Sequence, residues 1–337
     1  MKRIADGPAS PGMLAGLWQP GRPFDMLAYG DPNIDLVFGV QRVPVSDEKV
    51  LGRQLGSFAG GTVANAACAA GRMGCRVQAF GRVGDDSNGR FLLAEYARFG
   101  VDTGNVRTLE RSASATALII LEDRGEKALV YTPMEGARFA PERLAPALAV
   151  SALLYAMPYD FAEFDTVHAM ARRSRTLVAI DVEAAMVPGP ADMDRLLGMA
   201  DVVFMNDTSY RTIFGKLARL ADMRALLAKG PRVLVVTCGA AGALAVTARD
   251  EGSCPAFPAQ LVDSTGAGDC FNGAFLAALF EGRGLTACLR FACAAASMAV
   301  SRFGARSGIP ERSLVDELLA KGASDDEASP QIGATGQ

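Results

Sequence analysis

The sequence predicts an α/β protein built on a mostly parallel β-sheet with helices on both faces. From Asp25 onward, short β-rich runs alternate with helical patterns, and this alternation is typical of parallel strands connected by helices. Several runs, such as LVAID and VLVVT, are almost continuously apolar, as expected for strands that are covered on both faces. Two other stretches contain strands without intervening helices, and they predict a second, smaller sheet.

The apolar runs and the helical patterns between them define the expected elements in chain order. The predicted strands of the main sheet are Met26–Gly30, Arg76–Gly81, Ala152–Ala156, Thr176–Asp181, Asp201–Met205, Arg232–Thr237 and Ala243–Thr247. The predicted helices include Gly89–Phe99, Phe161–Arg173 and Leu217–Lys229. The smaller sheet is expected from residues 35–58 and 113–132, and the second segment predicts a hairpin that turns near Asp123–Gly125. We expect this sheet to project over the binding edge of the main domain as a lid.

Length and composition favour one large folded domain between two polar ends. Half of the 337 residues are hydrophobic and 21% are charged, which favours a sizeable core over disorder. We expect a disordered leader over residues 1–24, the domain over residues 25–321 and a disordered tail over residues 322–337. Pro and Gly interrupt the leader, so it lacks the apolar region of a secretion signal.

Charge, hydropathy and rare residues exclude several functional classes. The formal net charge is −3 and no basic block stands out, so we expect no nucleic-acid partner. The longest apolar runs, such as Ala292–Val300, are too short to span a bilayer, so we expect no membrane partner. The seven cysteines form no CxxC pair, which favours a reducing, cytoplasmic location. His168 is the only histidine, which excludes His-based catalytic triads and His-rich zinc sites.

The segment LVDSTGAGDCFNGAFLAALFEG contains the clearest chemical signal. An extended run leads through glycines into a helix, whose start presents unpaired amides and partial positive charge. The small residues Gly266, Ala267 and Gly268 allow an anion to approach those amides closely. Asp269 adds a carboxylate that could accept a hydroxyl proton during phosphoryl transfer to an alcohol. On its own, the motif favours an acidic residue at an ordinary helix start over a catalytic carboxylate.

A second glycine-rich turn, Gly60-Gly61-Thr62-Val63-Ala64-Asn65, precedes an alanine-rich helix. The two glycines permit close approach of a ligand, and the donors and acceptor of Asn65 suit a polyol, although an ordinary turn has the same appearance. Two other phosphate-binding motifs are missing. The sequence has no GxxxxGK[ST], and Phe271 occupies the third glycine position of GxGxxG, which argues against a dinucleotide oxidoreductase.

Together these segments resemble the ribokinase-like (PfkB) family of carbohydrate kinases, from about Asp25 to about Pro310. GGTVANAACAAGRMG and GRVGDDSNG match the N-terminal signature, and DSTGAGDCFNGAF matches the C-terminal one. The resemblance implies a three-layer α/β/α Rossmann-like fold with a small β-sheet lid. It also implies an ATP-dependent kinase that phosphorylates a hydroxyl of a sugar or sugar-like molecule, with Mg²⁺ bridging the nucleotide phosphates.

The resemblance also implies roles for individual positions. Asp269 is expected to be the general base, and the amides of Gly266, Ala267 and Gly268 to form an anion hole. The expected substrate-binding residues are Asn33, Asp35, Gly60, Gly61 and Asn65. The expected nucleotide-binding residues are Asn206, Thr237, Gly239, Gly242 and Cys293. A monovalent cation such as K⁺ is expected at Asp263, Thr265, Ser301, Gly304 and Ser307. Glu135, on the return from the lid, is a further candidate for a substrate hydroxyl, and equally a surface acid.

Two departures from the family pattern leave alternatives open. Ser209 stands where members commonly carry the Glu of Asn-x-x-Glu, which puts magnesium handling in doubt, and Asp207 is a candidate to compensate. Cys293 lies in the helix that often presents Asn or His to adenine, so base selectivity is open. A nucleoside kinase of the adenosine type and a catalytically weak, sugar-binding pseudokinase remain alternatives. Exposed lid strands would favour pairing between subunits, so we expect a homodimer.

Overall fold

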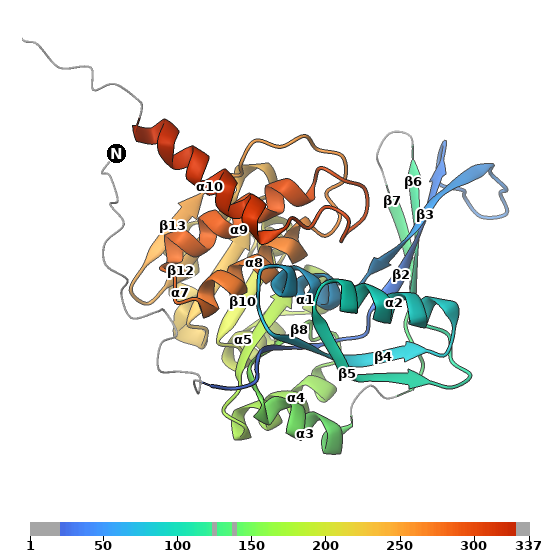
Figure 1. Cartoon of the computed structure of the whole chain (residues 1–337), viewed down its shortest axis with the longest axis horizontal. Helices are drawn as coiled ribbons and strands as arrows, with labels where there is room; N and C mark the ends of the chain where they lie inside the picture. Colours follow the sequence, from blue (N-terminus) through green and yellow to red (C-terminus); the bar gives the residue numbers. More distant parts are fainter. Residues whose placement is uncertain (1–20, 123–126, 137–139, 328–337) are drawn as a thin grey trace, which may run out of the picture.

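The computed structural model describes residues 21–122, 127–136 and 140–327, which form two sheets and their flanking helices (Figure 1). The main sheet has nine strands in the order β13-β12-β11-β10-β9-β8-β1-β4-β5. Its strands are β1 (Phe24–Tyr29), β4 (Val77–Gly84), β5 (Val101–Leu109), β8 (Ser151–Ala156), β9 (Leu177–Val182), β10 (Val202–Asn206), β11 (Val233–Thr237), β12 (Ala243–Thr247) and β13 (Glu251–Cys254). The pairs from β5 to β11 are parallel, and β12 and β13 are antiparallel.

Helices cover both faces of the main sheet, which gives three layers. One face packs against α1 (Thr62–Arg72), α2 (Ser87–Arg98), α8 (Ala267–Phe280), α9 (Leu285–Ala299) and α10 (Arg312–Glu327). The other face packs against α3 (Pro141–Ala149), α4 (Phe161–Arg173), α5 (Pro190–Met199), α6 (Asp207–Phe214) and α7 (Leu220–Leu226). In β8, Leu153 and Tyr155 join the first core whereas Leu154 joins the second. Since alternate side chains enter opposite cores, both faces of a central strand require apolar residues.

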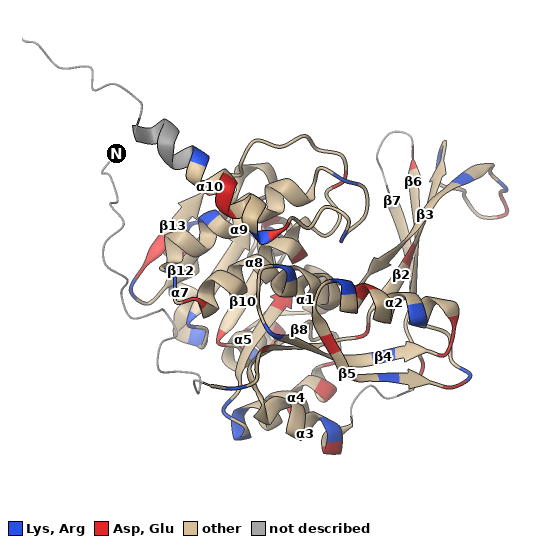
Figure 2. Ribbon diagram, viewed as in Figure 1, with Lys and Arg blue, Asp and Glu red and all other residues tan. Residues whose placement is uncertain are grey.

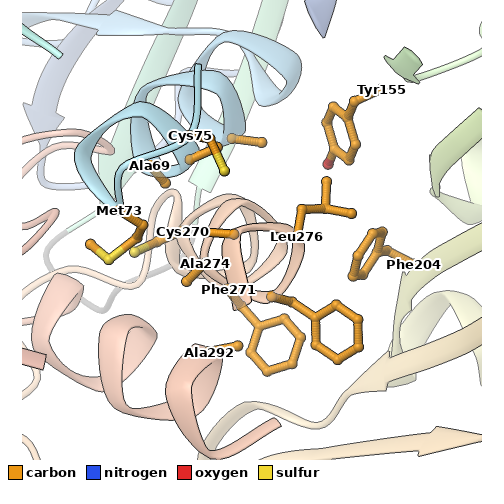
Figure 3. Packing of buried hydrophobic residues seen from close by; sticks show 14 of the residues in the cluster. Ala69, Met73, Cys75, Tyr155, Phe204, Cys270, Phe271, Ala274, Leu276 and Ala292 are labelled. Atoms are coloured by element: carbon orange, nitrogen blue, oxygen red, sulfur yellow. The ribbon is translucent and has the colours of Figure 1, made fainter. Parts of the chain in front are cut away.

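Helices α1 and α8 pack very closely, because small residues line their contact. A Cβ atom on Gly273 would lie 2.7 Å from Cβ of Ala69, which is too close for two carbon atoms. The position therefore requires glycine. Figure 3 shows Ala69, Met73, Cys270 and Ala274 together at this contact. The close approach brings the first turns of the two helices next to each other. Both helices are almost free of charged residues, and many of the charged residues lie on outer elements and loops (Figure 2).

The second sheet has four strands and projects from the main domain (Figure 1). Its strand order is β3 (Gly52–Gly60), β2 (Asn33–Val40), β6 (Thr116–Glu122) and β7 (Lys127–Thr132). Strand β2 pairs antiparallel with β3 and parallel with β6, and β6 pairs antiparallel with β7. These strands correspond to the two lid segments expected from the sequence. The turn expected near Asp123–Gly125 lies outside the described residues.

Some element boundaries differ from those expected. Arg22 lies in the expected leader, yet it is buried and donates to the carbonyl of Leu148 (3.1 Å) and to Oγ1 of Thr176 (2.9 Å). At the other end, α10 continues to Glu327, past the boundary expected at residue 321. The helix expected over Leu217–Lys229 is shorter, since α7 is followed by a 3₁₀ turn at Leu227–Lys229. Within the described residues, no helix combines the length and apolar character needed to cross a bilayer.

Candidate active site

Asp269 lies in the first turn of α8, directly beside the first turn of α1. Its Oδ2 accepts a hydrogen bond from Nδ2 of Asn65 at 2.8 Å. Burial raises the pKa of Asp269 to about 7, and the carboxylates of Glu183 and Asp35 act in the same direction. The Asn65 hydrogen bond and the charge of Arg306 oppose this rise. A carboxyl group with such a pKa is ionised in a useful fraction of molecules near neutral pH, as a general base requires.

The start of α8 combines a glycine at positive φ with backbone amides that have no acceptor within the helix. Gly266 has φ +77°, and a Cβ there would lie 2.6 Å from the carbonyl oxygen of Ala305, so glycine is required. The first hydrogen bond of the helix runs from Cys270 N to Gly266 O (2.8 Å). The amides of Gly268 and Asp269 therefore have no acceptor within the helix. Of the three amides expected to bind an anion, that of Ala267 donates to the carbonyl of Ser264 at 3.2 Å.

A polar group inside the sheet lies near Asp269. Nδ2 of Asn272 donates to Oδ2 of Asp181 and lies the same distance, 3.0 Å, from the hydroxyl of Tyr155. Burial, together with the charges of Asp269 and Glu183, raises the pKa of Asp181 to about 8. Sequence analysis did not identify these residues. Asn272 could have been found, because it lies one turn after Asp269 on the same face of α8.

The expected substrate-binding residues gather at the junction of the lid and α1. Asn33 donates to Asp35 at 2.6 Å, and both side chains are buried. A Cβ on Gly60 would overlap the carboxylate of Asp35, and Gly61 has φ +95°, so both positions require glycine. Burial raises the pKa of Asp35. The structure thus brings Asn33, Asp35 and the glycine pair to the same region as Asn65.

The backbone at Glu135 is held by an arginine that also forms a buried ion pair. The guanidinium of Arg82 lies 2.7 Å from the carboxylate of Asp31, and both side chains are 4% exposed. Arg82 also donates to the carbonyls of Glu135 (3.0 Å) and Gly136 (2.6 Å). The chain that returns from the lid is thereby held against β4. The Glu135 side chain itself is exposed.

Arg306 is a buried residue of this region that sequence analysis did not identify. It follows α9 in the segment SRFGARSGIP, where only Ser301, Gly304 and Ser307 were singled out. Its Nε donates to Oδ1 of Asn65 at 2.8 Å, and its Nη2 to the carbonyl of Gly60 at 2.7 Å. An arginine in a polar loop gives no sequence signal for this contact.

Four of the five expected nucleotide-binding residues lie at or just after the ends of β10 and β11, and the fifth, Cys293, lies in α9. Thr237 ends β11, and Gly239 (φ +54°) and Gly242 (φ +93°) shape the turn that follows. Asn206 caps α6, since its Oδ1 accepts from the amide of Ser209 at 2.7 Å. Cys293 is buried in α9, and its thiol points to the carbonyl of Cys254, 3.8 Å away. Asp207, the residue considered as a replacement for the missing Glu, is exposed.

The expected cation-binding residues join two loops beside α8. Oδ1 of Asp263 accepts from the amide (2.9 Å) and the hydroxyl (2.7 Å) of Thr265, and its Oδ2 accepts from the amide of Gly304 (2.8 Å). The hydroxyl of Ser301 donates to a carbonyl of its own turn, and Ser307 is exposed. The described part of the chain contains no group of three or more His, Cys, Asp or Glu side chains able to hold a metal ion.

Comparison with known proteins agrees with the resemblance seen in the sequence. The family model described as "pfkB family carbohydrate kinase" matches residues 24–312. A ribokinase of Bacillus subtilis is 33% identical over 299 residues, which cover 86% of this chain and 98% of the relative. A nucleoside kinase of Methanothermobacter thermautotrophicus is 27% identical, covering 85% and 93%. The solved structure of Arabidopsis thaliana ribokinase with ribose and ATP superimposes with a TM-score of 0.76 at 24% identity, covering 88% and 98%.

Proposed function

Because this chain belongs to the pfkB family of carbohydrate kinases, we propose that it transfers the γ-phosphoryl group of ATP to a hydroxyl of a sugar, with Asp269 as general base. The observation that carries the proposal is the hydrogen bond of 2.8 Å between Asn65 and Asp269 at the helix start. It places a carboxylate with a raised pKa next to amides that have no acceptor within the helix.

The proposed reaction is a direct transfer. The substrate hydroxyl oxygen forms a bond to the γ-phosphorus, the bond from that phosphorus to the leaving oxygen of ADP breaks, and Asp269 accepts the hydroxyl proton. The amides of Gly268 and Asp269, together with the helix dipole, stabilise negative charge on the transferring group. Asn65 fixes the position of the carboxylate. In members of this fold the lid would exclude water, which competes with the sugar as acceptor.

The substrate is proposed to be a neutral polyol. Asp35 is a buried acceptor and Asn33 its buried donor, and together they suit the hydroxyl groups of a sugar ring. Because Asp35, Asp269 and Glu183 all face this region, an acidic sugar would meet unfavourable charge. Ribose is the first substrate to test, since the Bacillus subtilis relative is a ribokinase. The nucleoside kinase relative supports nucleosides as the second class.

Mg²⁺ suits the acidic groups of the site. The charge of Glu183 raises the pKa of both Asp181 and Asp269, and the charge of Asp269 raises that of Asp181, so the three acids lie close to one another. Their ligand atoms are all oxygen, as Mg²⁺ prefers, so Asp181 and Glu183 are the residues that would hold the ion or its waters. When bound with ATP, Mg²⁺ neutralises charge on the phosphates. We also propose a monovalent cation near Asp263, whose carboxylate accepts hydrogen bonds from the hydroxyl of Thr265 in its own loop and from the amide of Gly304 in a second loop.

The lid supports the proposal of a homodimer. Leu129, Val130 and Tyr131 of β7 are exposed by 55%, 59% and 48%, and β7 lies at an edge of the lid sheet. An exposed apolar edge strand favours pairing with a second copy. The molar mass in solution, measured by light scattering, tests this. All seven cysteines are free thiols, which supports a reducing compartment such as the cytoplasm.

The function is tested by ADP release from Mg²⁺-ATP in the presence of D-ribose, other pentoses, ketohexoses, sugar acids or nucleosides. We expect turnover with one neutral sugar class, and a loss of roughly 10²–10⁴-fold in kcat for Asp269→Asn. Calorimetry with the same substrates distinguishes the alternative. Binding to both proteins without turnover in either would identify a sugar-binding pseudokinase and overturn the proposal.

A further inference from the structure

Arg306 connects the lid, helix α1 and the proposed catalytic base. Its side chain is 3% exposed, and its guanidinium carbon lies 5.5 Å from the centre of the Tyr96 ring. Nε donates to Oδ1 of Asn65, and Nη2 donates to the carbonyl of Gly60, the last residue of lid strand β3. The third nitrogen, Nη1, is buried without a hydrogen-bond partner in the part of the chain that the structure describes. A buried donor without a partner costs folding free energy, so the burial of this guanidinium needs a functional or structural reason.

The hydrogen bonds of Asn65 depend on which way its side-chain amide faces. In the observed orientation, Oδ1 faces Arg306 and Nδ2 faces Asp269. If the amide were flipped, its oxygen would face the Asp269 carboxylate, and neither oxygen could donate. Arginine has only donors, so the flipped amide would also place Nδ2 of Asn65, another donor, against Nε of Arg306.

We propose that Arg306 is a positioning residue that holds the Asn65 amide with its nitrogen toward Asp269. The inference deepens the proposed function, because its consequence for the reaction depends on Asp269 acting as the base. The hydrogen bonds of Arg306 go to Asn65 and to Gly60. Its effect on the position of the proposed base therefore passes through Asn65.

The segment around Arg306 is itself anchored on both sides. Toward the lid, the rings of Phe303 and Phe58 lie 5.3 Å apart, and a Cβ on Gly304 would overlap Phe58 at 2.7 Å. Toward α8, Ala305 packs against Gly266. Because residues 303–306 contact both β3 and the start of α8, Arg306 is held firmly enough to fix the orientation of its partner.

The charges around Asp269 make the proposal measurable. The acidic groups that face it are Asp35 on β2, Asp181 on β9 and Glu183 after β9. Tyr155 on β8 also interacts with this group, and Cys270 is the next residue of α8. Arg306 is the cation that lowers the pKa of Asp269 against these groups. Its removal should therefore raise that pKa, whereas a residue that only fills space would leave it unchanged.

The test compares Arg306→Met and Arg306→Gln with the parent protein. The pKa of Asp269 is measured without substrate, by carboxyl ¹³C NMR on aspartate-labelled protein, with Asp269→Asn identifying the signal. We expect Arg306→Met to raise this pKa by roughly one unit and to lower kcat about tenfold or more, with little change in KM for ATP. Gln keeps a donor for Asn65 without the charge, so Arg306→Gln should raise the pKa but retain more of kcat.

The double variant with Asn65→Ala tests whether Arg306 acts through Asn65. In that background, Arg306→Met should change kcat much less than in the parent, because the two residues act as one unit. Arg302→Met is the matched control, since Arg302 is exposed in the same segment and should change neither quantity. An unchanged Asp269 pKa in both Arg306 variants, or fully additive effects in the double variant, would overturn the proposal. Because the titration needs no substrate, its result is separate from whether the parent protein is a kinase.

Discussion

Oγ of Ser209 accepts a hydrogen bond of 3.1 Å from the backbone nitrogen of Ala184. Ser209 is 4% exposed and lies in the first turn of α6, at the position where a Glu was expected. Ala184 follows Glu183, whose carboxylate raises the pKa of both Asp181 and Asp269. The residue that replaces the expected acid thus fixes the backbone beside another acid that faces the site. This contact gives Ser209 a role that its sequence position alone did not indicate.

Replacing Ser209 by Ala should therefore destabilise the protein. The partly buried amide of Ala184 would lose its acceptor, which costs up to about 1–3 kcal/mol. Urea unfolding followed by circular dichroism measures the change. Thr208→Ala is the matched control, because Thr208 is exposed and should change stability by less than about 0.5 kcal/mol. Equal unfolding midpoints for Ser209→Ala and the parent would show that this contact contributes nothing.

The rate should depend on pH with an acid limb near the pKa of Asp269. The base must be ionised to accept a proton, and burial raises its pKa to about 7. We expect kcat to be maximal above this value and to fall about tenfold for each pH unit below it. The measurement is kcat at saturating sugar and Mg²⁺-ATP between pH 5 and 9. A rate that stays constant down to pH 5 would contradict the assignment of Asp269.

Stability should also change with pH, in a direction set by the same pKa. The folded pKa of about 7 lies above the reference value of 3.8, so the folded state binds more protons than the unfolded state between these values. The contribution of Asp269 to stability is therefore greatest below pH 4 and is lost as the pH rises through 7. Asp269→Asn has no such loss, so its Tm should exceed that of the parent at pH 8 and approach it near pH 4. The opposite trend in calorimetry would contradict a raised pKa.

The sequence predicted the elements that have a strong local pattern. The main sheet and the lid were expected correctly, because buried strands are continuously apolar and lid strands lack helices between them. Strand β5 was missed, since it lies at the sheet edge and contains several polar residues (VDTGNVRTL). Strand β13, with only EGSC, was missed for lack of any apolar run.

The candidate site shows the same limit. Asp269 and the neighbouring glycines could be singled out as candidates because one contiguous motif contains them. Arg306 contacts Asn65 across 241 positions of the chain, and Asn272 contacts Asp181 across 91. Contacts of this kind arise from the packing of α1, α8 and the loop after α9 on the sheet. No local pattern encodes them, so only the folded chain places these residues together.

Two glycines at the start of α8 should respond differently to the same substitution. Gly266 has φ +77°, and a Cβ there would lie within 2.8 Å of three atoms of Ala305. A Cβ atom on Gly268 would have no heavy atom within 4 Å, apart from its chain neighbours and the backbone of its own helix. Gly266→Ala should therefore lower both stability, by about 1–3 kcal/mol, and kcat. Gly268→Ala should fold with nearly the parent Tm, because its methyl group enters open space.

That open space is where the transferring phosphoryl group is proposed to approach the amides. A methyl group on residue 268 would occupy part of it, so we expect Gly268→Ala to lower kcat and raise KM for ATP without loss of stability. Steady-state kinetics together with thermal unfolding of both variants measures these effects. If Gly268→Ala had the kinetic constants of the parent, the anion would have to bind elsewhere. If Gly266→Ala were as stable as the parent, the contact with Ala305 would not constrain this turn.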